Sequence, residues 1–196
     1  MNMEQMKHQL TELIYTKSFK YSEDPVFRLV SGRMSNYYFN CKAVTLHPKG
    51  LYLIGNIIFS MIKDLKPAGI GGLTLGADPI ADAVAYTSFV QRAPIEAVVV
   101  RKSAKPHGTM QWIEGNIAGG DSVVVVDDVI TTGKSTIEAI ARMHEAGLKI
   151  VKVIALVDRQ EGGYEAVVKK LMEIGSEAPV ESVVRRDDVM ALYRSR

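Results

Sequence analysis

The sequence predicts an α/β fold with a mainly parallel central sheet flanked by helices. Short runs of β-branched and other apolar residues recur along the chain, as expected for strands that are buried on both faces. Between these runs lie longer stretches whose apolar residues recur at helical spacing. Regular alternation of the two patterns is typical of strands joined by helical crossovers.

The composition is that of an ordinary globular protein, and we expect one domain over residues 1–196. The chain is 47% hydrophobic and 23% charged, with a formal net charge of +2. This charge gives no indication of a nucleic-acid or membrane partner, and the longest uncharged apolar run, residues 51–62, is too short to cross a bilayer. Cys41 is the one cysteine, and the N-terminus lacks a signal-peptide pattern. We therefore expect a cytoplasmic protein.

The first half of the chain should begin with a helix over 3–16, where Met6, Leu10 and Ile14 share one stripe. Pro48 suits the first turn of a second helix, whose apolar stripe runs to about residue 65. The remaining elements expected here are a loop over 15–25, short strands over 27–30 and 36–40, a buried strand over 69–73 and a helix from Pro79.

The second half repeats the strand and helix pattern. Its expected strands cover 97–100, 123–126, 150–157 and 179–184, and its expected helices cover 136–146, 164–172 and 187–193. Residues 101–108 carry four potential cations among small residues and proline, which by itself is typical of a solvated loop.

The segment 123–135 is the most informative in the chain. Four valines predict a buried strand, Asp127 and Asp128 end the apolar run, and a Thr-Thr-Gly-Lys-Ser turn opens a helix with Ile137, Ile140, Ala141 and His144 on one stripe. A small polar loop at a helix N-terminus suits a phosphate, whereas carboxylates suit a sugar diol or hydrated magnesium. Together they indicate a ribose phosphate.

This segment has two alternative interpretations. The Gly-Lys-Ser end resembles a nucleotide-triphosphate P-loop, but that motif needs glycine where Asp128 stands. Alternatively, the two aspartates only end a strand, and Thr132 or Ser135 caps a helix.

The segment resembles the PRPP-binding motif of the type I phosphoribosyltransferases. The resemblance implies that family's fold, with a small N-terminal hood mainly from residues 1–45 and a core over about 50–165. It implies that Asp127 and Asp128 are catalytic and hold the ribose hydroxyls, and that Mg²⁺ is held mainly by PRPP, with these aspartates nearby and no direct protein ligand. The implied PRPP-binding residues of the segment are Asp127, Asp128, Val129, Ile130, Thr131, Thr132, Gly133, Lys134 and Ser135.

Residues 27–39, with the pattern F-x-L-x-S-G-R-x-S-x-Y-Y-F, resemble the hood of the orotate phosphoribosyltransferases. The resemblance implies an orotate site that includes Tyr38, Phe39, Thr131 and Arg159, with the arginine fork on the orotate carboxylate. For the aromatic residues, packing of an edge strand is the alternative to stacking on a planar ring. The chain departs from many relatives at Val30, where they carry lysine, and Lys42 is a candidate to supply that charge.

The basic segment R-K-S-A-K-P-H-G, residues 101–108, is similar to the mobile catalytic loop of the same family, and Ile113-Glu114-Gly115 matches as well. The resemblance implies that Lys105 and His107 are catalytic. It implies PRPP contacts from Arg101, Lys102, Lys105 and His107. Several relatives carry lysine where this chain has Gly76.

The resemblance implies transfer of phosphoribose from PRPP to N1 of orotate, giving orotidine 5′-monophosphate and pyrophosphate in de novo pyrimidine (UMP) biosynthesis. It also implies a homodimer in which Arg101, Lys105 and His107 serve the partner's site. Two alternatives remain open: a salvage enzyme for a purine or uracil, and a PRPP sensor that regulates transcription. Against the sensor, the chain shows no added DNA-binding domain and little net charge. Association with the next enzyme of the pathway is not determined by the sequence.

Overall fold

The computed structural model describes residues 1–28, 32, 34–103 and 112–196. Its centre is a six-stranded sheet in the order β10-β9-β8-β5-β6-β7, and all neighbours are parallel except β6 and β7. The predicted mainly parallel α/β sheet is therefore confirmed. The strands are β5 (Gly69–Leu73), β6 (Glu96–Val100), β7 (Ile113–Glu114), β8 (Ser122–Ile130), β9 (Lys149–Asp158) and β10 (Val180–Arg185).

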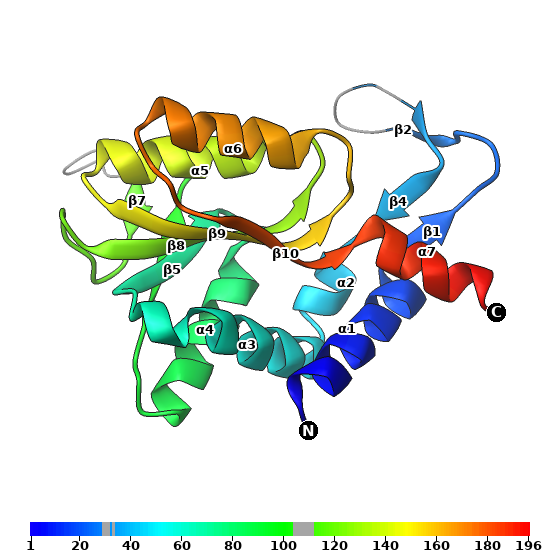
Figure 1. Ribbon diagram of the computed structural model, residues 1–196, viewed down its shortest axis with the longest axis horizontal. Coiled ribbons are helices and arrows are strands. Elements are labelled where there is room, and N and C mark those ends of the chain that lie inside the picture. The colour runs from blue at the N-terminus through cyan, green and yellow to red at the C-terminus, as the bar shows by residue number, and fades with distance from the viewer. Residues whose placement is uncertain (29–31, 33, 104–111) are drawn as a thin grey trace.

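Helices cover both faces of the sheet (Figure 1). One face carries α1 (Met3–Lys17), α3 (Pro48–Ile62) and α4 (Asp78–Val90), and the other carries α5 (Lys134–Glu145) and α6 (Gly163–Glu173). Each face buries its own apolar cluster against the sheet, which is the arrangement that makes the central strands apolar on both sides. The short elements α2 (Lys42–Thr45) and η1 (Lys63–Leu65) flank α3, and α7 (Arg186–Arg194) packs on α1. Within the described residues, no helix is long and apolar enough to cross a membrane.

Two small antiparallel strand pairs lie beside the carboxyl ends of β9 and β10 (Figure 1). They are β1 (Phe19–Tyr21) with β4 (Tyr37–Phe39), and β2 (Phe27–Arg28) with β3 (Met34–Ser35). We call these pairs the hood strands. The expected loop over 15–25 was partly wrong, because β1 forms inside it; its pairing with Phe39 and Tyr37 is long-range and leaves no local pattern.

The central segment differs from expectation in two details. Strand β8 does not end at Val126 but continues through both aspartates to Ile130, because β9 keeps pairing with it up to Asp158. The buried face of α5 is formed by Thr136, Ala139, Ile140 and Met143, whereas His144 is exposed. The helical stripe was therefore predicted correctly at Ile140 and wrongly at His144.

The strand order reverses between β5 and β8. From β5 the chain passes through α4 to β6 on one side, and the following parallel strand, β8, lies on the other side of β5. In open α/β sheets, ligands bind at the carboxyl ends of the strands at such a switch point. The fold therefore directs attention to the segments that follow β5 and β8.

Candidate active site

A cavity of about 770 Å³ opens at this switch point. Its walls come from the ends of β5 and β8, the first turn of α5, α2 and the start of the basic loop. The lining residues are Lys42, Leu73, Thr74, Leu75, Gly76, Lys102, Asp127, Asp128, Val129, Thr131, Thr132, Gly133, Lys134, Ser135 and Glu138. The structure thus brings together nearly the whole predicted PRPP segment, and of that segment only Ile130, a buried core residue, is missing from the wall.

Asp127 is buried and tied to the start of α5. Its Oδ2 accepts hydrogen bonds from the hydroxyls of Ser135 at 2.6 Å and Thr136 at 2.7 Å, and its Oδ1 accepts one from the backbone N–H of Asp128 at 3.0 Å. Burial outweighs these hydrogen bonds and raises the pKa of Asp127 to about 6. The carboxylate therefore holds the loop and the helix together at a cost in desolvation.

Asp128 has different neighbours. Its Oδ2 lies 3.9 Å from the Nζ of Lys42, and burial raises its pKa against the opposing effect of that lysine. A Cβ atom at Gly76 would lie 2.7 Å from the Oδ1 of Asp128. The glycine at this departure from the family pattern therefore leaves room for the carboxylate, and Lys42 provides the nearby positive charge.

The turn from β8 into α5 leaves backbone donors available. Gly133 has a φ of +77° and precedes the helix without a side-chain cap. A Cβ on Gly133 would lie 2.8 Å from the carbonyl oxygen of Gly163, so that glycine suits both the backbone angle and the space. The first N–H groups of a helix have no intrahelical partner and favour an anion. The turn is therefore suited to a phosphate beside the aspartates.

The basic loop begins on a two-stranded stem, which we call the loop stem: β6, β7, residues 101–103 and Trp112. The carbonyl of Trp112 accepts a 2.8 Å hydrogen bond from the N–H of Arg101, whose guanidinium pairs with Glu114 at 3.2 Å. Arg101 is not part of the cavity wall, whereas its neighbour Lys102 is. Lys105 and His107 lie outside the described residues, as does Val30.

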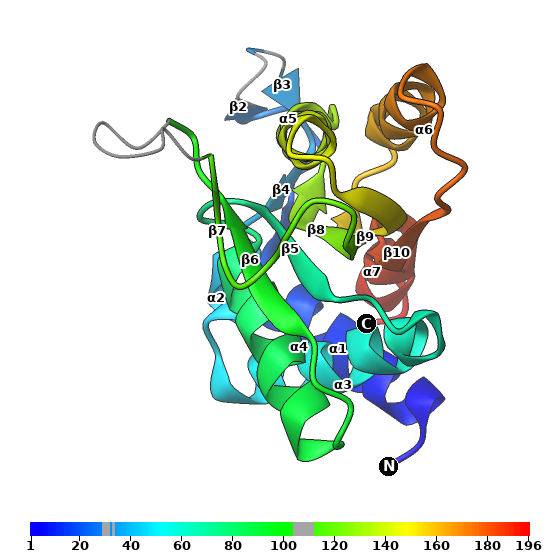
Figure 2. The same cartoon turned by 90° about the vertical axis from the view of Figure 1, so that its left-hand side faces the viewer.

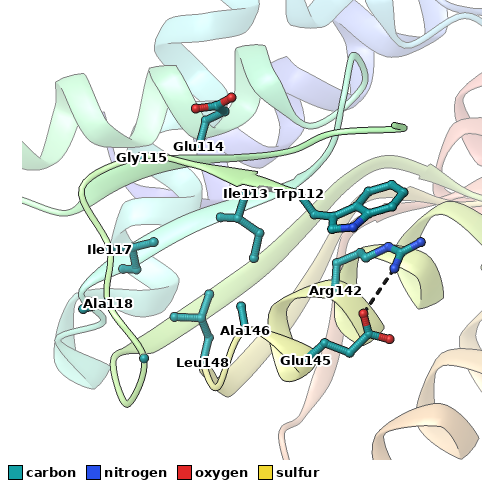
Figure 3. A pocket seen from close by; sticks show the side chains of 11 residues that line it. Trp112, Ile113, Glu114, Gly115, Ile117, Ala118, Arg142, Glu145, Ala146 and Leu148 are labelled. Atoms are coloured by element: carbon teal, nitrogen blue, oxygen red, sulfur yellow. Dashed lines mark hydrogen bonds and ion pairs between the residues drawn. The ribbon is translucent and has the colours of Figure 1, made fainter. Parts of the chain in front are cut away.

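Helix α5 also supports the loop stem (Figure 3). The guanidinium carbon of Arg142 lies 3.6 Å from the ring centroid of Trp112, and Arg142 also pairs with Glu145 at 3.2 Å. Beneath this stack lies a groove of about 340 Å³, lined in part by Ile113, Ile117 and Leu148. Since α5 starts at the turn 131–135, the helix connects that turn to the loop stem. Sequence reasoning missed this contact, because no local pattern links positions 112 and 142.

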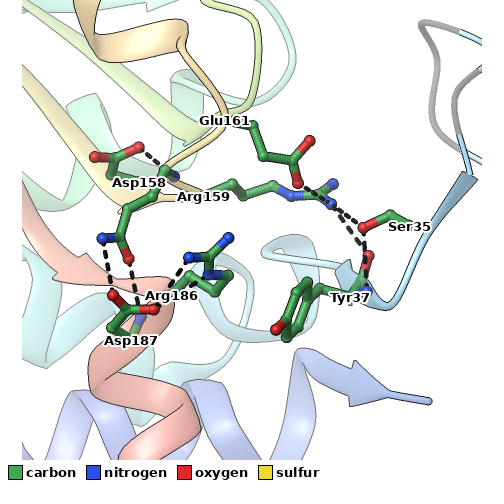
Figure 4. Close-up of polar contacts among 8 residues, drawn as sticks. Ser35, Tyr37, Asp158, Arg159, Glu161, Arg186 and Asp187 are labelled. Carbon is green, nitrogen blue, oxygen red and sulfur yellow. Dashed lines mark hydrogen bonds and ion pairs between the residues drawn. The ribbon is translucent and has the colours of Figure 1, made fainter. Parts of the chain in front are cut away.

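Arg159 lies between the sheet and the hood strands (Figure 4). Its Nη2 donates to the hydroxyl of Ser35 at 3.1 Å, to the carbonyl of Tyr37 at 3.1 Å and to Glu161 at 2.7 Å. Its Nε is buried and has no hydrogen-bond partner among the described residues. The predicted carboxylate-binding arginine is thus held rigidly by the hood, with one buried N–H donor still to be satisfied. The backbone N–H of Arg159 donates to Ile130, which ties this loop to the end of β8.

The two aromatic residues predicted for the orotate site differ in exposure. Phe39 is buried, packs on Phe19 at a centroid distance of 5.0 Å and lies 5.9 Å below the guanidinium of Arg159. Tyr38 is 41% exposed and stacks on Phe27. Phe39 therefore packs beneath the guanidinium of Arg159, and of the two rings it is Tyr38 that is exposed to solvent.

The described residues contain no group of three or more His, Cys, Asp or Glu side chains arranged to hold a metal ion. In the cavity, both oxygens of Asp127 accept hydrogen bonds, from Asp128, Ser135 and Thr136, whereas Asp128 has Lys42 and neighbouring backbone N–H groups as its partners. This donor set fits a magnesium ion that takes most of its ligands from a bound diphosphate.

Comparison with known proteins agrees with this geometry. The model of the phosphoribosyl transferase domain matches residues 41–183. The chain is 44% identical over 164 residues to an orotate phosphoribosyltransferase of Aquifex aeolicus, covering 84% of this chain and 90% of that protein. Among solved structures, Mycobacterium tuberculosis orotate phosphoribosyltransferase in complex with Fe(III) dicitrate superposes with a TM-score of 0.77 at 35% identity, covering 94% of this chain and 98% of that one. The same enzyme in complex with PRPP gives a TM-score of 0.72 at 31% identity, with coverages of 94% and 92%.

Proposed function

The chain belongs to the phosphoribosyl transferase domain family and, within it, to the orotate phosphoribosyltransferases, and from this premise we propose how its site transfers phosphoribose from PRPP to N1 of orotate. The products are orotidine 5′-monophosphate and pyrophosphate, in a step of de novo pyrimidine biosynthesis. One observation carries the proposal most directly: a single cavity at the switch point combines an acidic pair with an open helix N-terminus.

The 5′-phosphate of PRPP is expected at the turn formed by residues 131–135, where backbone N–H groups and hydroxyls converge. The ribose then lies over Asp128, whose carboxylate suits its hydroxyls, while Asp127 holds Ser135 and Thr136 in position. As the C1′–O bond to pyrophosphate breaks and the C1′–N1 bond forms, positive charge grows on the ribose ring. A carboxylate fixed beside that ring stabilises the charge where it develops.

The departing pyrophosphate carries negative charge. Lys102 and residues 74–76 line the cavity and are proposed to meet it. Arg101, Lys105 and His107 are proposed to approach it as well. Mg²⁺ bound to PRPP would neutralise part of the diphosphate charge and improve the leaving group, with Asp128 nearby. The orotate N1 proton is acidic enough to leave without a dedicated base.

The orotate carboxylate is proposed to bind Arg159. This assignment is supported by the buried Nε that has no partner in the described residues and by the hydrogen bonds that hold the guanidinium to Ser35 and Tyr37. Glu161 already contacts the same guanidinium at 2.7 Å, so a substrate carboxylate must compete with it or bind the other edge of the fork. The exposed ring of Tyr38 would cover the pyrimidine.

We further propose a homodimer in which the basic loop is shared. The loop stem supports a division between neighbouring cations, because Lys102 faces its own cavity whereas Arg101 turns toward Glu114. Arg101, which does not line its own cavity, is therefore proposed for the partner's site. Lys105 and His107 are assigned to the same site by family resemblance.

The direct test of function follows orotate consumption by ultraviolet absorbance with PRPP and Mg²⁺ present. Adenine, hypoxanthine and uracil are assayed in parallel by nucleotide formation. Turnover of orotate alone is expected. Turnover of another base would point to a salvage enzyme, and PRPP binding without turnover of any base would point to a sensor.

Loop sharing is tested by mixing two inactive variants, Lys105→Ala and Asp128→Asn. Each is expected to lose on the order of 10²–10³ in rate, the usual cost of removing one charge-stabilising contact. A mixed dimer holds one site with both native residues, so activity should return to as much as half of the wild-type level per mixed dimer. Absence of recovery after confirmed subunit exchange would contradict sharing.

A further inference from the structure

Lys42, the first residue of α2, brings a positive charge into the cavity. Its Nζ lies 3.9 Å from the Oδ2 of Asp128, and its side chain is 49% exposed, whereas that of Asp128 is 11% exposed. Among the described residues, three lysines line the cavity: Lys42, Lys102 and Lys134. The proposed function places Lys102 at the diphosphate and leaves Lys42 without a role in the reaction.

The backbone of Lys42 is held by buried neighbours. Cys41 precedes it, Val44 and Thr45 follow it, and all three are buried. The N–H groups of Val44 and Thr45 both donate to the carbonyl of Cys41, at 2.9 and 2.8 Å. A Cβ atom at Gly50 of α3 would collide with the carbonyl of Val44, so the two helices pack in direct contact. The lysine side chain therefore extends into the cavity from a fixed point of the core.

Helix α2 lies on the side of the sheet opposite to α5. Figure 2 shows α2 together with α3 and α4 on one side and α5 on the other. The turn proposed for the 5′-phosphate, residues 131–135, opens α5. PRPP carries its 5′-phosphate and its diphosphate at opposite ends of the ribose. With the 5′-phosphate on that turn, the diphosphate is directed away from α5, toward α2 and the segment 74–76.

The segment 74–76 cannot supply a cation on this side. Its sequence is Thr-Leu-Gly, and a Cβ atom at Gly76 would lie 2.7 Å from the Oδ1 of Asp128. Residue 76 therefore has no room for a longer side chain while Asp128 keeps its place. Gly76 and the Nζ of Lys42 lie beside different oxygens of the same carboxylate. A positive charge next to Asp128 thus comes from α2.

We infer that Lys42 binds the diphosphate of PRPP: its ammonium donates to a diphosphate oxygen beside Asp128 and keeps that contact as the C1′–O bond breaks. The inference rests on the proposed function, because it concerns the same substrate. A charge-assisted hydrogen bond at this point strengthens PRPP binding and stabilises the negative charge of the leaving group. The ammonium also separates the diphosphate from Asp128, two groups of like charge. Its proton stays on the lysine throughout.

The test measures PRPP binding by isothermal titration calorimetry, with Mg²⁺ present and orotate absent. Lys42→Met keeps the length of the side chain and removes its charge. Its affinity for PRPP should fall about 10–100-fold, the effect of losing a hydrogen bond to a charged group. Ribose 5-phosphate, which has no diphosphate, should bind the variant as tightly as the wild type. Lys42→Gln should show the same selective loss, and Lys42→Arg, which keeps the charge, should retain PRPP binding.

Two further proteins separate this contact from a general effect of charge. Lys49→Met is the matched control, because Lys49 is an exposed lysine of α3 outside the described cavity wall, and it should bind PRPP like the wild type. A lysine that only neutralises Asp128 has no effect once that carboxylate is removed. Lys42→Met is therefore repeated in the Asp128→Asn protein, where it should still weaken PRPP binding several-fold. Urea unfolding checks that each variant is folded.

Three results would overturn the inference. The first is wild-type affinity for PRPP in both neutral variants of Lys42. The second is an equal loss of affinity for PRPP and for ribose 5-phosphate. The third is disappearance of the effect in the Asp128→Asn protein, which would reduce Lys42 to a partner of that carboxylate.

Orotate turnover separates this inference from the proposed function. A wild type that turns over orotate but binds PRPP independently of Lys42 would keep the function and remove the inference. A wild type whose PRPP affinity depends on Lys42, but which turns over no orotate, would do the reverse.

Discussion

Replacing Asp127 by asparagine should make the protein more stable at neutral pH. Burial raises the pKa of Asp127 from 3.8 to about 6, so the folded state holds the proton more tightly than the unfolded chain does. By thermodynamic linkage, the stabilising effect of the proton on the folded state is complete below pH 3.8 and is lost as the pH rises through 6. At pH 7.5 the ionised carboxylate is therefore a net cost to folding.

The pKa shift sets the size of this cost. Each pKa unit corresponds to about 1.36 kcal/mol, so a shift of about two units gives an upper value of about 3 kcal/mol. The asparagine oxygen can accept from Ser135 and Thr136, but its amide nitrogen then faces the backbone N–H of Asp128, and this lost hydrogen bond costs about 1–3 kcal/mol. We therefore expect Asp127→Asn to raise the free energy of unfolding by no more than about 2 kcal/mol at pH 7.5, while turnover falls.

Urea unfolding of the wild type and Asp127→Asn at pH 7.5, 6.0 and 4.5 measures the effect. The advantage of the variant should shrink as the pH falls, because the wild-type carboxylate then gains its own proton. The control is Asp187→Asn: hydrogen bonding to Gln160 lowers the pKa of Asp187, which is exposed, so its removal should bring no gain at neutral pH. The reasoning is refuted if Asp127→Asn is less stable than the wild type at pH 7.5, or if the difference is independent of pH.

Four further outcomes are expected. Arg159→Lys should raise the KM for orotate at least ~10-fold and leave the KM for PRPP unchanged, because lysine cannot offer a two-pronged contact to a carboxylate. Gly133→Ala should lower the unfolding free energy by about 1–3 kcal/mol and weaken PRPP binding; Gly175→Ala, at a φ of +72° in open space, carries only the backbone strain and should leave PRPP binding intact. Arg142→Ala should reduce kcat more than it changes PRPP affinity, because it releases the loop stem, and equal losses would contradict this. Chelation with EDTA should stop turnover, and added Mg²⁺ should restore it.

The fold could be predicted where the sequence carries a local signal. Runs of valine and isoleucine marked the buried strands, and apolar stripes marked the long helices. Strand β1 could not be predicted, because an alternation of three residues is too short to be a signal and becomes a strand only by pairing with β4. The extent of β8 was underestimated because charged residues are rarely buried, and the hydroxyls that make Asp127 tolerable lie eight and nine residues further along the chain.

The part of the candidate site that carries a local sequence signal was also predicted. Residues 127–135 are contiguous, so their motif could be read directly, and the structure brings them to one cavity. Lys42 was suspected only as a substitute for a charge missing at Val30, and its contact with Asp128 required the fold. The stack of Arg142 on Trp112 joins residues 30 positions apart on different elements, and neither shows a pattern of its own.

The two aspartates were expected to act alike on the ribose, and the strand explains why their proposed roles divide. Successive side chains of a strand point to opposite faces, so neighbours inside β8 must meet different surroundings. Asp127 meets the hydroxyls at the start of α5, and both of its oxygens are occupied there. Asp128 meets Lys42 and lies close against Gly76, where a Cβ atom would lie 2.7 Å from its Oδ1. We therefore propose that Asp128 is the carboxylate that meets the substrate, and that Asp127 acts through the turn 131–135, which it holds in place. On this argument, loss of Asp128 should fall mainly on kcat, whereas loss of Asp127 should appear first in the affinity for PRPP.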